Sequence, residues 1–153
     1  MKNILFAIFL FFSCTSSALG GAWDIGPFDN DDAMDWVWEL SESDDLSVVK
    51  QALQDVIDTS GYLEAPTASM AIAAAEVVAA LKGALRAQLP AEVIEWVERN
   101  ESEVDADLVA TARQAIARIR DEELSELAQL WSDSEEAAEE WRAELTDLEQ
   151  RLQ

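Results

Sequence analysis

The stretch SMAIAAAEVVAAL, residues 69 to 81, has a helical composition and is apolar on all sides except at Glu76. A helix that is apolar all round is typical of the buried centre of a protein rather than its surface. The alanines also permit neighbouring helices to approach closely. We therefore expect this segment to be a central helix against which the rest of the chain packs.

Amphipathic segments with a helical period of apolar residues lie on both sides of this stretch, and no segment shows sustained alternation of apolar and polar residues. The expected inward residues are Ala33, Trp36, Val37 and Leu40; Leu46, Val49, Leu53, Val56 and Ile57; Val93, Ile94 and Val97; Leu108, Ala112, Ala115, Ile116 and Ile119; Leu124, Leu127, Ala128 and Trp131; Ala138, Trp141, Leu145, Leu148 and Leu152. The pattern predicts an all-α, single-domain, compact bundle of about six to seven helices around the buried Ala-rich helix.

Several residues mark where these helices begin and end. Asn30 can cap the first helix, and Gly61 can take the left-handed conformation that closes the second. Pro90 opens a short helix, and Ser132 with Glu135 fits a capping box for the last one. No linker or internal repeat interrupts the series, so one domain is expected.

The first twenty residues, MKNILFAIFLFFSCTSSALG, have the pattern of a signal peptide: Lys2, an apolar run from Ile4 to Phe12, then small residues. That run is about half the length needed to cross a membrane. Cleavage after Gly20 would leave residues 21–153 as an exported domain, periplasmic or extracellular. The alternative is a lipoprotein, because Phe11 to Cys14 resembles a lipobox and Cys14 would then carry a lipid anchor.

The chain is strongly acidic, with 10 basic and 32 acidic residues among 153 and a formal net charge of -22. Such a charge repels nucleic acid and anionic membrane surfaces, and it favours cationic partners. We therefore expect no nucleic-acid partner and no membrane insertion after signal removal. The charge by itself is typical of a well-solvated exported domain, which is the favoured interpretation. The functional alternative is a protein partner, basic in character.

The residue types present exclude several kinds of catalytic site. The chain has no histidine, which excludes a Ser-His-Asp triad and the usual zinc ligand sets. Its 5 glycines form no phosphate-binding loop, and its single cysteine is Cys14 in the signal segment. Carboxylate chemistry, alone or with a hard divalent metal ion, is what remains for an enzyme.

Two acidic features are candidates for that chemistry. Asp29, Asn30, Asp31 and Asp32 supply oxygen ligands of the kind that calcium prefers, but at spacings that match an EF-hand poorly. Short acidic side chains at a helix start also cap its free N–H groups, and this interpretation is favoured. We predict no bound metal or cofactor.

Glu76 is the second feature, because a carboxylate on a buried helix must be paired, hydrogen-bonded or desolvated. It could be a buried general acid or base. A structural ion pair with Arg86, Arg113 or Arg118 is the favoured interpretation, since the sequence offers no second catalytic group beside it.

The segment GAWDIGPFDNDDAMDW, residues 21 to 36, carries a family signature, GAWxxGxFDNDDAxDW. With GYLEA at 61–65, AAAEVVAAL at 73–81, LPAEVIEWV at 89–97 and EWRAEL at 140–145, it resembles the bacterial family catalogued as domain of unknown function 4259. Because the function of that family is unknown, the resemblance supplies no catalytic residue or cofactor to carry over to this chain. Asp24 stands where that family often has glycine, and the added export signal also departs from its usual pattern.

We expect an exported, non-enzymatic module that binds a protein partner, with neutralisation of a basic toxin, as immunity proteins do, as one form of this role. The alternative is a carboxylate- or divalent-metal-dependent hydrolase that uses the Asp29–Asp32 cluster and Glu76. The candidate binding residues are Trp23, Phe28, Asp29, Asn30, Asp31, Asp32, Trp36 and Glu76.

Overall fold

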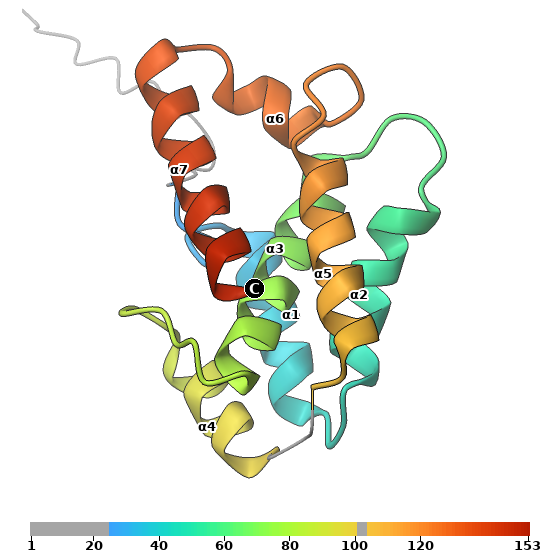
Figure 1. The fold of residues 1–153 in the computed structure, drawn as a ribbon, viewed down its shortest axis with the longest axis vertical. Coiled ribbons are helices and arrows are strands. Elements are labelled where there is room, and N and C mark those ends of the chain that lie inside the picture. The colour runs from blue at the N-terminus through green and yellow to red at the C-terminus, as the bar shows by residue number, and fades with distance from the viewer. Residues whose placement is uncertain (1–24, 101–103) are drawn as a thin grey trace, which may run out of the picture.

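The structure is a computed structural model that describes residues 25–100 and 104–153. Trp23, Cys14 and the expected signal segment therefore lie outside the described residues. Seven helices make up the described part: α1 (Asp31–Glu42), α2 (Ser47–Asp58), α3 (Ala65–Leu81), α4 (Ala91–Arg99), α5 (Ala106–Ile119), α6 (Glu126–Trp131) and α7 (Glu135–Arg151). The chain is thus the expected all-α bundle (Figure 1).

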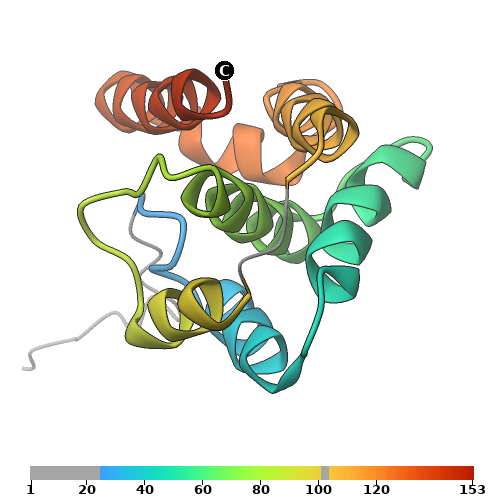
Figure 2. The ribbon, with the colours of Figure 1, turned by 60° about the horizontal axis from the view of Figure 1, so that its bottom comes forward.

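Helix α3 is the centre of the bundle, as its sequence predicts. It packs against each of the six other helices, and Figure 2 shows it enclosed, with α5 and α7 on one side and α1 and α4 on the other. Every residue from Ala71 to Ala80 is buried. The helix begins at Ala65, one turn before the apolar stretch, and holds Pro66 in its first turn, where the missing N–H costs nothing.

Helices α1, α5 and α7 each bury the whole apolar stripe that the sequence predicts. In α2 the stripe is also buried, except that Leu46 and Ile57 are half-buried. The second helix is followed by Gly61 with a φ of 106°, the left-handed conformation predicted for it. Periodicity therefore located the buried face correctly in these four helices.

Three expectations for the shorter helices and the caps are wrong. In α4, Val93 is buried as expected, but Ile94 is 41% exposed. The second core residue is Trp96, which is fully buried and donates from Nε1 to the Ser43 carbonyl oxygen at 2.9 Å. Leu124 precedes α6 and is 42% exposed. Ser134, not Ser132, caps α7, because its hydroxyl accepts from the Ala137 amide.

Leu124 is excluded from α6 because its backbone pairs with the segment before α3. The Leu63 amide donates to the Leu124 carbonyl at 2.7 Å, and the Glu126 amide donates to the Leu63 carbonyl at 2.9 Å. This isolated parallel bridge fixes the start of α6 beside the start of α3. No helix in the described ranges is both long enough and apolar enough to cross a membrane.

Candidate functional site

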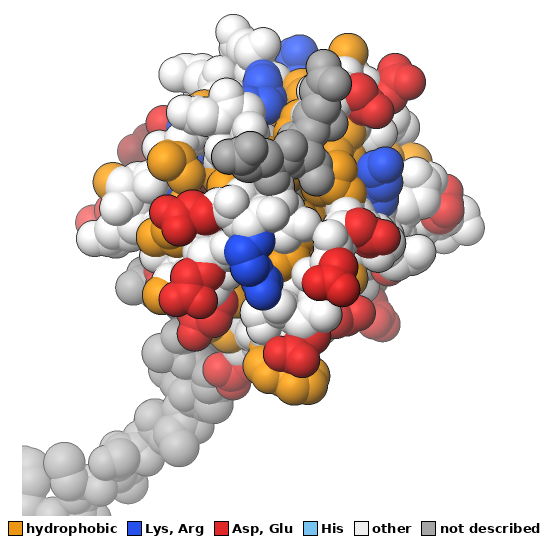
Figure 3. Space-filling view, turned by 90° about the horizontal axis from the view of Figure 1, so that it is seen from below, with side chains coloured by type: hydrophobic (Ala, Val, Ile, Leu, Met, Phe, Trp, Pro, Cys, Tyr) orange, Lys and Arg blue, Asp and Glu red, His pale blue; other side chains and the backbone are white. Residues whose placement is uncertain are grey.

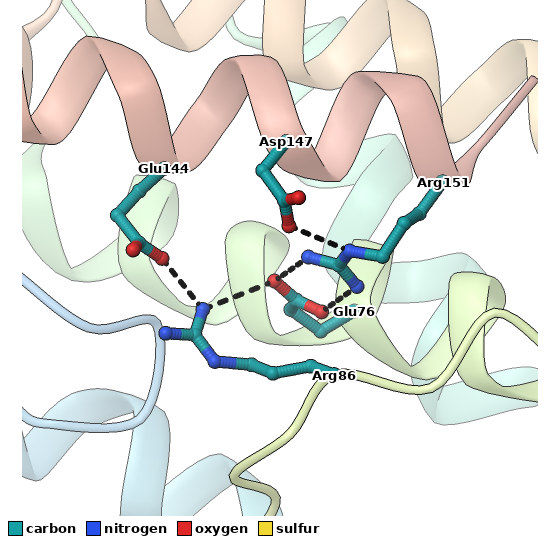
Figure 4. A network of polar contacts seen from close by, with 5 residues as sticks. All are labelled: Glu76, Arg86, Glu144, Asp147 and Arg151. Atoms are coloured by element: carbon teal, nitrogen blue, oxygen red, sulfur yellow. Dashed lines mark hydrogen bonds and ion pairs between the residues drawn. The ribbon is translucent and has the colours of Figure 1, made fainter.

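A buried carboxylate on the central helix is the most unusual feature of the described core. Glu76 is only 1% exposed, yet it lies between two arginines. Arg151 binds it with both ends of its guanidinium, Nη1 to Oε2 at 2.6 Å and Nη2 to Oε1 at 2.7 Å (Figure 4). Arg86 approaches Oε1 from the other side at 3.5 Å. Both carboxylate oxygens therefore accept hydrogen bonds, as burial of a charge requires.

Two further carboxylates on α7 complete the network shown in Figure 4. Arg86 Nη1 binds Glu144 Oε2 at 2.7 Å, and Arg151 Nε binds Asp147 Oδ2 at 2.7 Å. The hydrogen bond to Glu76 raises the pKa of Arg151 above its usual value, and burial of the guanidinium opposes this rise. The network joins α3, the segment after α3, and the last turns of α7.

Glu76 thus forms ion pairs, and one of the three partners proposed from the sequence, Arg86, is among them. The other two are placed elsewhere. Arg113 is exposed, and Arg118 donates to the backbone carbonyls of Gly61 and Leu124. The principal partner, Arg151, was missed, because the distance of 75 residues leaves no periodic signal that would link it to α3.

A small cavity of about 20 Å³ lies beside this network, between the segment before α1, α3 and α7. Asn30, Ser69, Glu76, Trp131 and Trp141 are among the residues that line it. Ser69 Oγ is buried there and has no hydrogen-bond partner among the described residues. A space of this size suits one water molecule rather than a substrate.

The acidic start of α1 has the geometry of a helix cap. Asn30 Oδ1 accepts from the Ala33 amide at 2.9 Å, and Asp31 and Asp32 occupy the first turn, where carboxylates interact well with the helix dipole. Asp29 is folded over Gly26: a Cβ added to Gly26 would meet Asp29 Oδ2 at 2.0 Å. Among residues 25–100 and 104–153, no group of acidic, histidine or cysteine side chains is arranged to hold a metal ion.

The structure separates the candidate residues rather than gathering them. Phe28 and Trp36 are buried in the core. Asn30 and Glu76 line the small cavity, while Asp29 lies at a neighbouring open hollow with Arg86, Glu140 and Glu144. Asp31 and Asp32 line neither space, and Trp23 is outside the described residues.

One surface residue was overlooked in the sequence. Trp38 is 69% exposed, more than any other large apolar side chain in the described ranges, although Trp36 two positions earlier is buried. The signal that finds it is the helical period itself, since position 38 falls opposite the buried stripe of Ala33, Val37 and Leu40. Its neighbours on that outer face are acidic.

The fold and this site define a small all-α domain with a buried arginine–carboxylate network and an acidic surface. A family model described as Domain of unknown function (DUF4259) matches residues 21–144, and the chain belongs to that family. No curated protein and no solved structure matches the chain.

Proposed function

We propose that this domain is an exported, non-enzymatic module that binds a basic protein. The proposal rests on one observation: most of the arginines are engaged in contacts within the domain. Arg86, Arg120, Arg142 and Arg151 form ion pairs within the domain. Arg99 and Arg118 donate to backbone carbonyl oxygens. Few cationic groups are left to neutralise the carboxylates of the surface.

The outer surface is correspondingly acidic. Figure 3 shows Asp and Glu side chains spread across one end of the molecule, with basic side chains fewer. A field of this kind speeds encounter with a positively charged partner and repels nucleic acid and anionic lipid. Neutralisation of a basic toxin in the cell envelope is one role that this surface suits.

The geometry of Glu76 favours binding over the hydrolase alternative. A general acid or base must exchange a proton with substrate, but both oxygens of Glu76 accept from arginines and the adjoining cavity suits only one water. The hydrolase proposal predicts that Ca²⁺, Mg²⁺ or Mn²⁺ raises the melting temperature of the domain, since a bound ion stabilises the folded state. We expect no such rise.

A pull-down tests the binding proposal directly. The bait is the chain from residue 21, and the control is a scrambled chain of identical composition, which carries the same charge without the fold. We expect the folded bait alone to retain a discrete basic protein from an envelope extract at about 0.15 M salt and to release it at high salt. Equal retention by both baits, or none by either, would contradict the proposal.

Export is the second part of the proposal. Removal of residues 1–20 would give a mature chain that begins at Gly21, and the lipoprotein alternative would give one that begins at lipidated Cys14. Mass spectrometry of the protein from the envelope fraction distinguishes the two. An intact Met1 terminus on cytoplasmic protein would contradict both.

A further inference from the structure

The outer face of α1 carries a tryptophan that the described residues leave largely uncovered. Trp38 is 69% exposed and Met34, one turn earlier on the same face, is 39% exposed. The buried side of α1, with Trp36 at 3% exposure, packs on the core, and Trp38 lies outside that core. Exposed tryptophans are frequent energetic centres of protein interfaces because one residue covers a large area.

The same face is acidic along its whole length. Asp35 lies three residues before Trp38 and Glu42 four residues after it, spacings that make both carboxylates neighbours of the indole on a helix. Both are exposed, as is Asp31 one further turn back. None of these three carboxylates forms an ion pair with another described residue. No lysine or arginine occurs between Lys2 and Lys50 in the sequence.

The nearest arginine contacts recorded on α1 lie at one end of the helix. Arg99 donates from Nη2 to the Ser41 carbonyl oxygen at 3.0 Å, which places its charge beside the last turn. Within residues 25–100 and 104–153, no ion pair therefore offsets the negative charge around Trp38 and Asp35. It combines a bare aromatic face with carboxylates one turn away on either side.

We propose that this face of α1 is the docking surface for an arginine-bearing segment of the basic partner; the inference rests on the proposed function. A guanidinium can stack on the indole of Trp38 and donate at the same time to Asp35 or Glu42, because its donors lie in the plane of the stacked group. A lysine ammonium can do only one of the two well. The surface therefore selects arginine over lysine of equal charge.

The probe for the test is a helical peptide with arginines four residues apart, compared with a peptide in which lysine replaces every arginine. Binding is measured by titration calorimetry on the chain from residue 21 at about 0.1 M salt. Trp38→Ala is expected to weaken binding of the arginine peptide about tenfold and to reduce its advantage over the lysine peptide. Trp38→Phe keeps a smaller aromatic face, so its affinity for the arginine peptide should lie between those of the wild type and Trp38→Ala.

Matched controls separate the indole from general effects. Leu130→Ala removes another exposed apolar side chain, 48% exposed on α6, and should leave binding unchanged. Asp35→Asn with Glu42→Gln should weaken binding more than Asp133→Asn with Glu139→Gln, which removes the same charge from an exposed region near the start of α7.

The outcomes divide cleanly. Equal binding of the arginine peptide by wild type and Trp38→Ala would overturn the docking surface and leave the proposed function standing. Failure of the wild type to bind either peptide would likewise overturn the docking surface, whereas the proposed function is decided by the pull-down. Equal affinity of the wild type for the two peptides would overturn the proposal, because the α1 face is expected to select arginine over lysine. Circular dichroism shows whether each variant is folded.

Discussion

Arg151 binds both carboxylate oxygens of Glu76, although the two residues are 75 positions apart in the chain. Glu76 is in the middle of the central helix, and Arg151 is the last residue of α7. The pair thus fastens the C-terminal end of the chain to the centre of the core. Leu152, which follows it, is fully buried.

Breaking this pair from one side should be costly. Arg151→Met leaves Glu76 buried with only the longer contact to Arg86, and a buried charge deprived of its partner costs about 3–5 kcal/mol. Urea unfolding followed by circular dichroism measures the loss. Replacing both partners, as Glu76→Leu with Arg151→Met, should recover a large part of it, because no buried charge is then left unpaired.

Arg142→Met is the control for this experiment. It breaks the ion pair between Arg142 and Glu122, in which both side chains are about half exposed. An exposed pair contributes about 0–1 kcal/mol to the free energy of unfolding. If Arg151→Met costs no more than Arg142→Met, the Glu76–Arg151 pair does not hold α7 to the core in the way the geometry indicates.

The contact between Gly26 and Asp29 leads to a second prediction. A methyl group on Gly26 would overlap Asp29 Oδ2, so Gly26→Ala must push the exposed Asp29 side chain out of its position. We expect a loss of about 1 kcal/mol, the usual cost of a displaced rotamer. Asp29→Ala removes the overlapping atoms, and in that background Gly26→Ala should cost clearly less.

A double-mutant cycle of thermal or urea unfolding gives the coupling between these two positions. Equal cost of Gly26→Ala in both backgrounds would mean that the glycine is required for another reason. Both substitutions change little of the surface that unfolding exposes, so the m-value of unfolding should not change.

The fold could be predicted largely from the sequence because its strongest signal is local. Residues 69–81 are apolar on every side, and the helices around them carry one apolar stripe each, so burial follows from spacing alone. The error in α4 has a local basis. Trp96 follows Val93 by three residues and lies on the same buried face, whereas Ile94 lies about 100° around the helix from Val93. The Trp96 indole N–H donates to the Ser43 carbonyl oxygen just after α1, and periodicity does not specify a partner of this kind.

The candidate site was harder to predict for the same reason. Asn30 as the cap of α1 is a local interaction and follows from the sequence. The partner of Glu76 depends on which arginine the folded chain brings to α3, and spacing cannot choose between Arg86, Arg113, Arg118 and Arg151. The exposure of Trp38 does follow from the helical period, because position 38 lies opposite the buried stripe of α1.

Two tryptophans on α1 provide a third prediction. Trp36 is 3% exposed and Trp38 is 69% exposed, so the same substitution tests the core and the surface of one helix. Trp36→Ala should cost about 3–5 kcal/mol of unfolding free energy through the cavity it leaves. Trp38→Ala should change stability by less than about 0.5 kcal/mol. A comparable loss from both would mean that Trp38 packs against the domain.

Asp45 supplies a prediction about pH. Hydrogen bonds from the Ser47 hydroxyl and amide lower the pKa of its carboxyl below the usual value of 3.8, and the amide contact to Oδ1 measures 2.8 Å at the start of α2. Because the pKa is lower in the folded state, the carboxylate adds stability above its unfolded pKa. That contribution is lost as pH falls through the lower, folded value.

The melting temperature of Asp45→Asn relative to wild type isolates this effect from the titration of the other carboxylates. Wild type should melt higher near neutral pH, keep its advantage down to about pH 5, and lose it progressively as the pH falls through the lowered, folded pKa of Asp45. Asp44→Asn is the matched control, because it removes the same charge from the neighbouring exposed side chain. A difference between wild type and Asp45→Asn that stays constant from pH 7 to pH 2 would mean that the carboxylate does not stabilise the start of α2 through its charge.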